Sequence, residues 1–311
     1  MIAHAVFLGS SDTCRAAAGD GACWAVIVQS FKFILIGRYS ASEAWRPVLV
    51  ICLFIIITMM SYFRFSWGKP LMAMWYSFIV LSHVVLDGSM LGLPAVSPDQ
   101  WGGFALTIVL ATTGLGVALP AGIVLALARR SKLPLVRSLS VAYIELIRGV
   151  PLVAVLFLAS VMLPLLLPDS FSPTKVGRAC AAIGFFAAAY IAEVLRGGLQ
   201  TIPSGQFEAA RALGMNYVVT TLTVVLPQAF RVTIPPLINT MVAIFKDTSL
   251  VAVIGLTDFL GIVRVVTVDP QWRLFYLEPL IFAAIVYFFF CWYMSRVGFR
   301  MERSLMNSTA R

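Results

Sequence analysis

Seven long apolar runs constrain this chain more than any other feature of its sequence. Each approaches or exceeds the ~20 residues that a helix needs to cross a hydrocarbon core about 30 Å thick. The runs do not alternate apolar and polar residues, as the strands of a membrane β-barrel do. They predict an all-α integral membrane protein with spans at residues 47–63, 70–86, 102–128, 142–167, 178–199, 228–245 and 275–295.

Charge is sparse and unevenly placed. Only 12% of the 311 residues are charged, and the mean hydropathy is +0.92. The net charge of +9 would suit a nucleic-acid partner, but basic residues that flank membrane spans on the cytoplasmic side explain it better, so we expect no nucleic-acid binding. The run Arg129–Lys132 and the C-terminal tail are the strongest basic anchors. They place residues 203–227 inside and, with seven spans, the N-terminus outside.

Three regions leave alternatives open. Residues 22–37 are apolar but contain Gln29 and Lys32, which suits either a weak span or a helix lying at the membrane surface. Residues 249–266 form a further apolar stretch, which we expect to be a re-entrant or broken helix. A disulfide between Cys14 and Cys23 requires that the N-terminal segment face an oxidising space. We expect the other three cysteines, which lie in spans, to be packing residues.

A half-polar segment at residues 203–227 separates the fifth and sixth runs. Ser204 is a suitable helix N-cap, and Glu208 would lie in the first turn, where a negative charge suits the helix dipole. Gly214 would end this helix, and Asn216 would cap a second helix that runs to the end of the segment. The pattern predicts helix, glycine turn and helix. It fits either a helix that docks on a partner or an amphipathic loop on the bilayer.

This segment also resembles a known signature. "EAARALGMNYVVTTLTVVLP" is similar to the cytoplasmic loop of permeases in ATP-binding-cassette importers, which begins with E-A-A, has a glycine shortly after and ends near Leu-Pro. Further motifs resemble the polar amino-acid branch of these permeases in order and spacing: "YIELIRGVPLV" (143–153), "YIAEVLRGGLQTIPSGQFEAARALGM" (190–215), "LPQAFRVTIPPLIN" (226–239) and "FKDTSLVAVIGL" (245–256).

The resemblance implies a division of the chain. Residues 100–300 would be the permease core, with about five spans, and residues 301–311 a cytoplasmic tail. Residues 1–99 would be an N-terminal extension with one or two spans. Its "GACW" and "GRYSASEAWRP" resemble the larger permeases of general L-amino-acid uptake systems, although members of that group often carry one more N-terminal span.

The resemblance also implies partners and a multi-pass location in the bacterial inner membrane. An ATP-binding subunit would use ATP and Mg²⁺, since this chain has no P-loop and is expected to bind no cofactor and catalyse no reaction. A periplasmic amino-acid-binding protein would deliver substrate, and a second permease, expected to be a different but similar chain, would complete the path within the lipid. The family's ATPase-coupling residues correspond to Glu208, Ala209, Ala210, Arg211, Gly214, Leu226 and Pro227.

Charged residues inside the apolar runs are candidates for the translocation path, because intramembrane charges are costly and commonly functional. Glu145 and Arg148, and again Glu193 and Arg196, stand three residues apart and could neutralise each other on one helix face. Such pairs favour a packing role over substrate contact. A third group interrupts the apolar sequence near residue 247. The path candidates are Glu145, Arg148, Glu193, Lys246, Asp247 and Thr248, and Asp258 is a further intramembrane charge.

Two other classes of function remain alternatives to an ATP-driven importer of L-amino acids. An ion-coupled secondary transporter of small polar solutes would need an ion site and commonly has inverted repeats. A membrane-embedded enzyme would need a nucleophile or a metal constellation. The sequence shows neither a convincing repeat nor such a constellation, and His4 and His83 stand alone.

Overall fold

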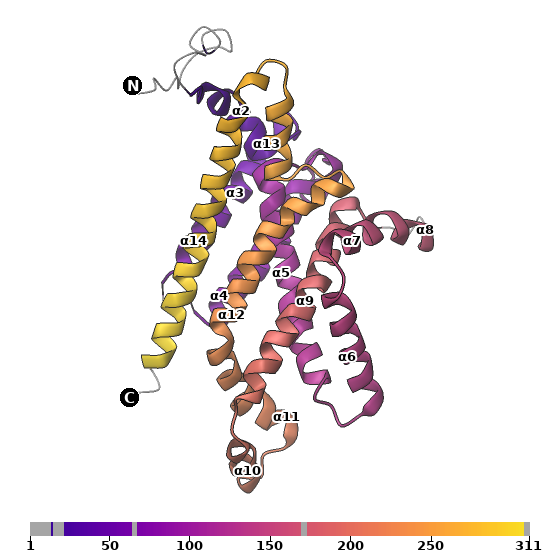
Figure 1. Ribbon diagram of the computed structural model, residues 1–311, viewed down its shortest axis with the longest axis vertical. Coiled ribbons are helices and arrows are strands. Elements are labelled where there is room, and N and C mark those ends of the chain that lie inside the picture. The colour runs from indigo at the N-terminus through magenta and orange to yellow at the C-terminus, as the bar shows by residue number, and fades with distance from the viewer. Residues whose placement is uncertain (1–13, 15–21, 64–66, 169–172, 308–311) are drawn as a thin grey trace.

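The computed structural model describes residues 14, 22–63, 67–168 and 173–307. These residues form helices joined by short turns (Figure 1). The α-helices are α2 (Ala25–Ile36), α3 (Trp45–Met60), α4 (Lys69–Asp87), α5 (Gly103–Ala128), α6 (Pro134–Arg148), α7 (Leu152–Phe157), α8 (Leu163–Leu166), α9 (Lys175–Gln200), α10 (Ser204–Ala212), α11 (Tyr217–Val219), α12 (Leu226–Asp247), α13 (Phe259–Val268) and α14 (Leu277–Asn307).

Six of the seven predicted spans are confirmed as helices. Within the described part of the chain, six helices are long and apolar enough to cross a membrane, or up to seven if one bent pair counts as a span. That pair, Pro134–Arg148 and Leu152–Leu166, contains the region predicted as a span over residues 142–167, which is broken into two helices and is not one continuous helix. The chain bends there by 106° between α6 and α7. Gly149 ends α6, and Pro151, which lacks an N–H and restricts the residue before it, prevents the helix from continuing.

Helices α5 and α9 form the centre of the molecule. Small residues recur every four positions along the buried face of α5, at Gly114, Ala118, Gly122 and Ala126. A methyl group added at Gly122 would lie only 2.6 Å from Cγ2 of Ile191 on α9. Lipid provides no hydrophobic drive for helices to associate, so this close van der Waals packing of small residues holds the pair together.

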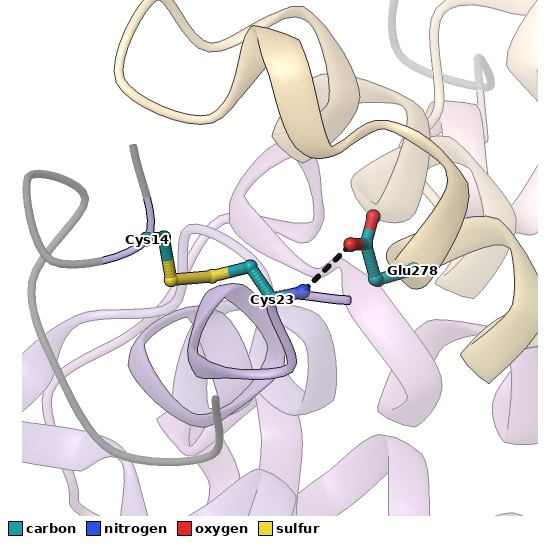
Figure 2. The surroundings of a disulfide bond; sticks show 3 residues. All are labelled: Cys14, Cys23 and Glu278. Carbon is teal, nitrogen blue, oxygen red and sulfur yellow. Dashed lines mark hydrogen bonds between the residues drawn. A yellow bond between two sulfur atoms is a disulfide. The ribbon is translucent and has the colours of Figure 1, made fainter. Parts of the chain in front are cut away.

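The N-terminal region and the start of α14 meet at one end of this core. Cys14 and Cys23 form a disulfide, and the Cys23 N–H donates to Glu278 at 2.8 Å (Figure 2). Helix α10 lies at the opposite end of the molecule (Figure 1). Disulfides persist in oxidising compartments, so the bond agrees with the predicted external N-terminus. Residues 203–227, at the opposite end of the molecule, would then lie inside.

The stretches at residues 22–37 and 249–266, for which the sequence left alternatives open, are helical. Residues 248–254 form a 3₁₀ helix that ends at Gly255, where φ is +78°, and α13 follows, so the apolar stretch at 249–266 is broken as expected. Asp258 caps α13 by accepting from the N–H groups of Leu260 and Gly261. Helix α2 has 12 residues. At about 18 Å it is too short to cross the hydrocarbon core.

We predict that Gly122→Ala lowers the thermal stability of the chain. The new methyl group would contact the Cβ atom of Ile191 at 2.8 Å, so α5 and α9 would have to separate. Overpacking of this kind costs about 1–3 kcal/mol. Thermal unfolding of the purified chain, followed by tryptophan fluorescence, measures the effect.

Gly197→Ala is the matched control, because a methyl group there meets no described atom within 4 Å. Both variants gain the same helix propensity, so equal unfolding temperatures for the two would contradict the packing role of Gly122.

Candidate coupling segment and interhelical charge cluster

Helix α10 begins one residue earlier than predicted. Pro203, with extended backbone angles, occupies the N-cap position, so Ser204 is the first helical residue and not the cap. Glu208 consequently lies in the second turn, beyond the positions where the helix dipole acts most strongly. The predicted helix itself is confirmed.

The predicted glycine turn is confirmed. Gly214 has a φ of +73°, and its N–H donates to the Arg211 carbonyl at 2.9 Å, while the Met215 N–H donates to the Ala210 carbonyl at 3.0 Å. These two bonds form a Schellman motif, which favours glycine at its left-handed position. Asn216 caps the next helix through a 2.9 Å bond from the Val219 N–H, as expected.

The second helix does not end near Pro227 as predicted. Residues 220–225 are π-helical, and helical structure continues through α12 to Asp247. Pro227 lies in the first turn of α12, at the junction with the π-helical residues, where its missing N–H is tolerated. The segment is therefore rigidly continuous with a long apolar helix.

The two faces of α10 differ. Phe207 is half-buried and the Ala210 side chain is buried against this chain, so Ala210 is not on the outer surface. Glu208, Ala209 and Arg211 are exposed. Exposed apolar side chains continue this surface on both sides of the turn: Leu213 before Gly214, and Tyr217 and Val218 after it. Apolar and charged groups together form a surface suited to docking against another protein.

Two contacts connect α10 to the membrane helices. The Arg130 guanidinium lies 5.7 Å from the centre of the Phe207 ring and donates to the Leu199 carbonyl at 3.1 Å. The Gln228 side chain on α12 donates to Gln206 at 3.0 Å. A displacement of α10 would therefore act on α5, α9 and α12.

A charge cluster joins α5, α6 and α9 directly beside these contacts. Glu193 bonds Arg196 at 3.0 Å and Arg129 at 3.2 Å, and lies 3.7 Å from Arg148. Glu145 pairs with Arg129 at 3.1 Å. The expected pairing of Glu193 with Arg196 is confirmed. The expected pairing of Glu145 with Arg148 was wrong, because both side chains reach across to neighbouring helices.

Sequence reasoning missed Arg129 as a member of this cluster. The basic run at residues 129–132 served only to predict orientation, although two adjacent arginines directly after a span could have indicated interhelical pairing. Three arginines around two glutamates leave the cluster with a net charge of +1, so both glutamates are fully balanced. This arrangement favours helix packing for Glu145, Arg148 and Glu193, and their contact with substrate stays a prediction.

The other path candidates lie elsewhere. Lys246 and Asp247 end α12, some 30 Å from its first residue at about 1.5 Å per residue, so they are near the outer end. Thr248 is fully buried and donates to the Phe245 carbonyl at 2.8 Å, where the chain changes to a 3₁₀ helix. Thr248 thus stabilises the break, while the Lys246 side chain is exposed. The structure does not bring these residues together with the charge cluster.

Comparisons with known proteins show which family this chain belongs to. The sequence profile of the family described as "Binding-protein-dependent transport system inner membrane component" matches residues 118–305, which include α10, its turn and the charge cluster. The chain belongs to this family. It is a multi-pass permease subunit of an ATP-binding-cassette importer in the inner membrane. The family works with an ATPase and a binding protein, so ATP chemistry belongs to a partner, and the secondary-transporter and enzyme alternatives lose their basis.

Relatives extend the similarity to nearly the whole permease. The inner membrane amino-acid ABC transporter permease protein YhdY of Escherichia coli is 43% identical, with 91% of this chain and 78% of that protein covered. The glutamate/glutamine/aspartate/asparagine transport system permease protein BztC of Rhodobacter capsulatus is 36% identical, with 97% and 85% covered. The crystal structure of an amino acid ABC transporter with histidines matches with a TM-score of 0.57 and 29% identity over 65% of this chain and 92% of that one.

We predict that Glu193→Gln lowers the unfolding temperature of the permease. The amide would leave Arg129, Arg148 and Arg196 without the carboxylate that all three approach. Losing hydrogen bonds to a charged, partly buried group costs about 1–3 kcal/mol.

Glu145→Gln serves as the matched control. Its carboxylate is 57% exposed and pairs with Arg129 alone among the described residues, so the cost should stay below about 1 kcal/mol. Equal destabilisation by the two variants in thermal unfolding would contradict the central place of Glu193.

Proposed function

We propose that this permease carries polar L-amino acids, as the larger permease chain of a general amino-acid uptake system. The observation that carries the proposal is the similarity to YhdY and BztC, whose names specify amino-acid transport, over at least 91% of this chain. The match extends through the N-terminal region, which resembles the larger permeases of this type. Residues 1–99 then form the extension, 100–300 the transport core and 301–311 the tail.

Residues 204–227 are the proposed ATPase-coupling segment. Glu208, Ala209 and Arg211 form the exposed surface that contacts the ATPase, and Gly214 sets the turn that presents it. Ala210 supports this surface from within the chain, while Leu226 and Pro227 join it to α12. Exposed Leu213 and Tyr217 supply the apolar part of the interface.

A second permease completes the proposed path, and we infer that it is a different but similar chain. The path candidates near the outer end, Lys246 and Asp247, offer one group for each charged end of an amino acid. The ammonium and the carboxylate of an amino acid each need an opposite charge in the path, because an unpaired ion in a low-dielectric environment is costly. The binding protein supplies the first selection of substrate.

We predict that Glu208→Lys prevents stable association with the ATPase subunit. Reversing an exposed charge at the interface should weaken association about tenfold or more. Co-purification of the ATPase with the tagged permease from the native host measures the effect.

Asp99→Lys is the control, because it reverses an exposed acidic side chain outside the proposed interface. The docking assignment would be contradicted if the Glu208→Lys permease inserts in the membrane and still co-purifies with as much ATPase as the Asp99→Lys permease.

A second prediction concerns the turn. Gly214→Val should reduce ATP-driven uptake at least severalfold, since a β-branched residue is strained at a φ of +73°. Gly205→Val is the matched control within α10, because a Cβ atom there meets no described atom within 4 Å and Gly205 does not have a positive φ. Equal uptake by both variants in membrane vesicles would show that the turn geometry is not needed.

The substrate and the partner permease can be tested together. Affinity purification followed by mass spectrometry should recover an ATPase and a second, similar permease chain. Uptake into proteoliposomes that contain this assembly and its binding protein should favour glutamate, glutamine, aspartate or asparagine over purely apolar amino acids. Recovery of this permease alone as a homodimer would refute the heterodimer, and uptake of only apolar amino acids would refute the substrate class.

A further inference from the structure

A basic and aromatic groove lies at the inner end of the permease, and none of its lining residues belongs to the proposed coupling segment. It has a volume of about 620 Å³, and its described lining residues are Tyr62, Trp292, Ser295, Arg296, Phe299, Arg300 and Arg303. All but Tyr62 belong to α14. Tyr62 follows the end of α3, so the groove spans two helices of the core's periphery.

The position of the arginines along α14 places them at the membrane boundary. The helix has 31 residues, begins beside the disulfide-linked end and runs toward the end that holds α10 (Figure 1). At 1.5 Å per residue, Arg296, Arg300 and Arg303 lie about 28 to 39 Å from its first residue. The hydrocarbon core is about 30 Å thick, so the three guanidinium groups lie at the level of the inner headgroups.

Aromatic rings hold two of these arginines. The Arg300 guanidinium lies 4.2 Å from the centre of the Tyr62 ring, and that of Arg296 lies 5.3 Å from the Trp292 ring. Such contacts orient a guanidinium while leaving its N–H groups available for an anion. Within the described residues, the groove has no carboxylate in its lining. Glu302 is adjacent to Arg303 in the chain and is not a lining residue.

An exposed apolar stripe leads directly into the groove. Ile281, Ile285, Phe288 and Trp292 follow one another at three- and four-residue spacing along α14, and each is at least 44% exposed. The spanning part of α14 is only 11% buried, the lowest share among the six candidate spans of the described chain. A ligand that fits both parts has an anionic head and long apolar chains.

We propose that this groove binds the headgroup of an anionic phospholipid of the inner leaflet. The phosphodiester accepts hydrogen bonds from Arg296, Arg300 and Arg303, and the acyl chains lie along the apolar stripe of α14. Basic pockets between membrane helices on the cytoplasmic side recognise such headgroups through the same chemistry. The lipid anchors α3 to the inner end of α14 without contacting the coupling segment.

Native mass spectrometry of the full-length permease, titrated with phosphatidylglycerol in detergent, tests the proposal. We expect phosphatidylglycerol to bind more tightly than phosphatidylcholine. Replacing two boundary arginines in Arg300→Gln/Arg303→Gln should weaken phosphatidylglycerol binding about tenfold. Lys132→Gln/Arg137→Gln removes the same charge from exposed positions at the start of α6 and should leave the affinity unchanged.

Three results would overturn the proposal. Equal weakening by the two double variants would show attraction to net charge alone, and equal affinity for phosphatidylcholine would show a site for acyl chains only. Displacement of phosphatidylglycerol by inorganic phosphate at similar concentration would identify a free-anion site. An Arg300→Lys/Arg303→Lys variant that keeps the charge should keep most of the preference for phosphatidylglycerol, which separates binding from damage to the fold.

Discussion

The close contact between α5 and α9 is the interaction on which the rest of this permease depends. Small residues at Gly114 and Gly122 let isoleucines of α9 pack directly against the α5 backbone. At the outer end of this pair, the Gly103 N–H bonds the Thr257 carbonyl before α13. At the inner end, Arg129 bonds Glu193. Both specialised ends of the molecule are thus attached to one rigid helix pair.

The same arrangement connects α10 to the membrane helices. Helix α10 exposes its charged surface and buries Ala210 against the chain, and Phe207 lies under Arg130. Arg130 follows Arg129, the residue that pairs with both glutamates of the charge cluster. Ion pairs of this kind gain strength from partial burial and from several shared partners, so the cluster joins α5, α6 and α9 more firmly than a single exposed pair would.

Much of the fold could be predicted from local features of the sequence, such as the length of apolar runs and the positions of turn and cap residues. Apolar run length located six spans, and Gly214 and Asn216 located the turn of the coupling segment. The break at Gly149–Pro151 was missed because apolar composition outweighed the proline signal, and Pro227 was wrongly taken as a terminator. Partners across helices were the hardest to predict. The Glu145–Arg148 pair looked satisfied locally, yet the tertiary structure offers Arg129 and Glu193 instead, and no spacing rule encodes that choice. The inward direction of Ala210 likewise depends on how α10 packs.

The most direct test of this account measures the coupling efficiency of an Arg130→Gln permease in the assembled importer. Amino acid imported per ATP hydrolysed is determined in proteoliposomes, with Lys132→Gln as the neighbouring control. The account predicts that the ATPase still assembles and hydrolyses ATP, while import per ATP falls for Arg130→Gln alone, since the contact with Phe207 and the bond to Leu199 are lost. An unchanged ratio in both variants would contradict the proposed connection between the coupling segment and the α5–α9 core.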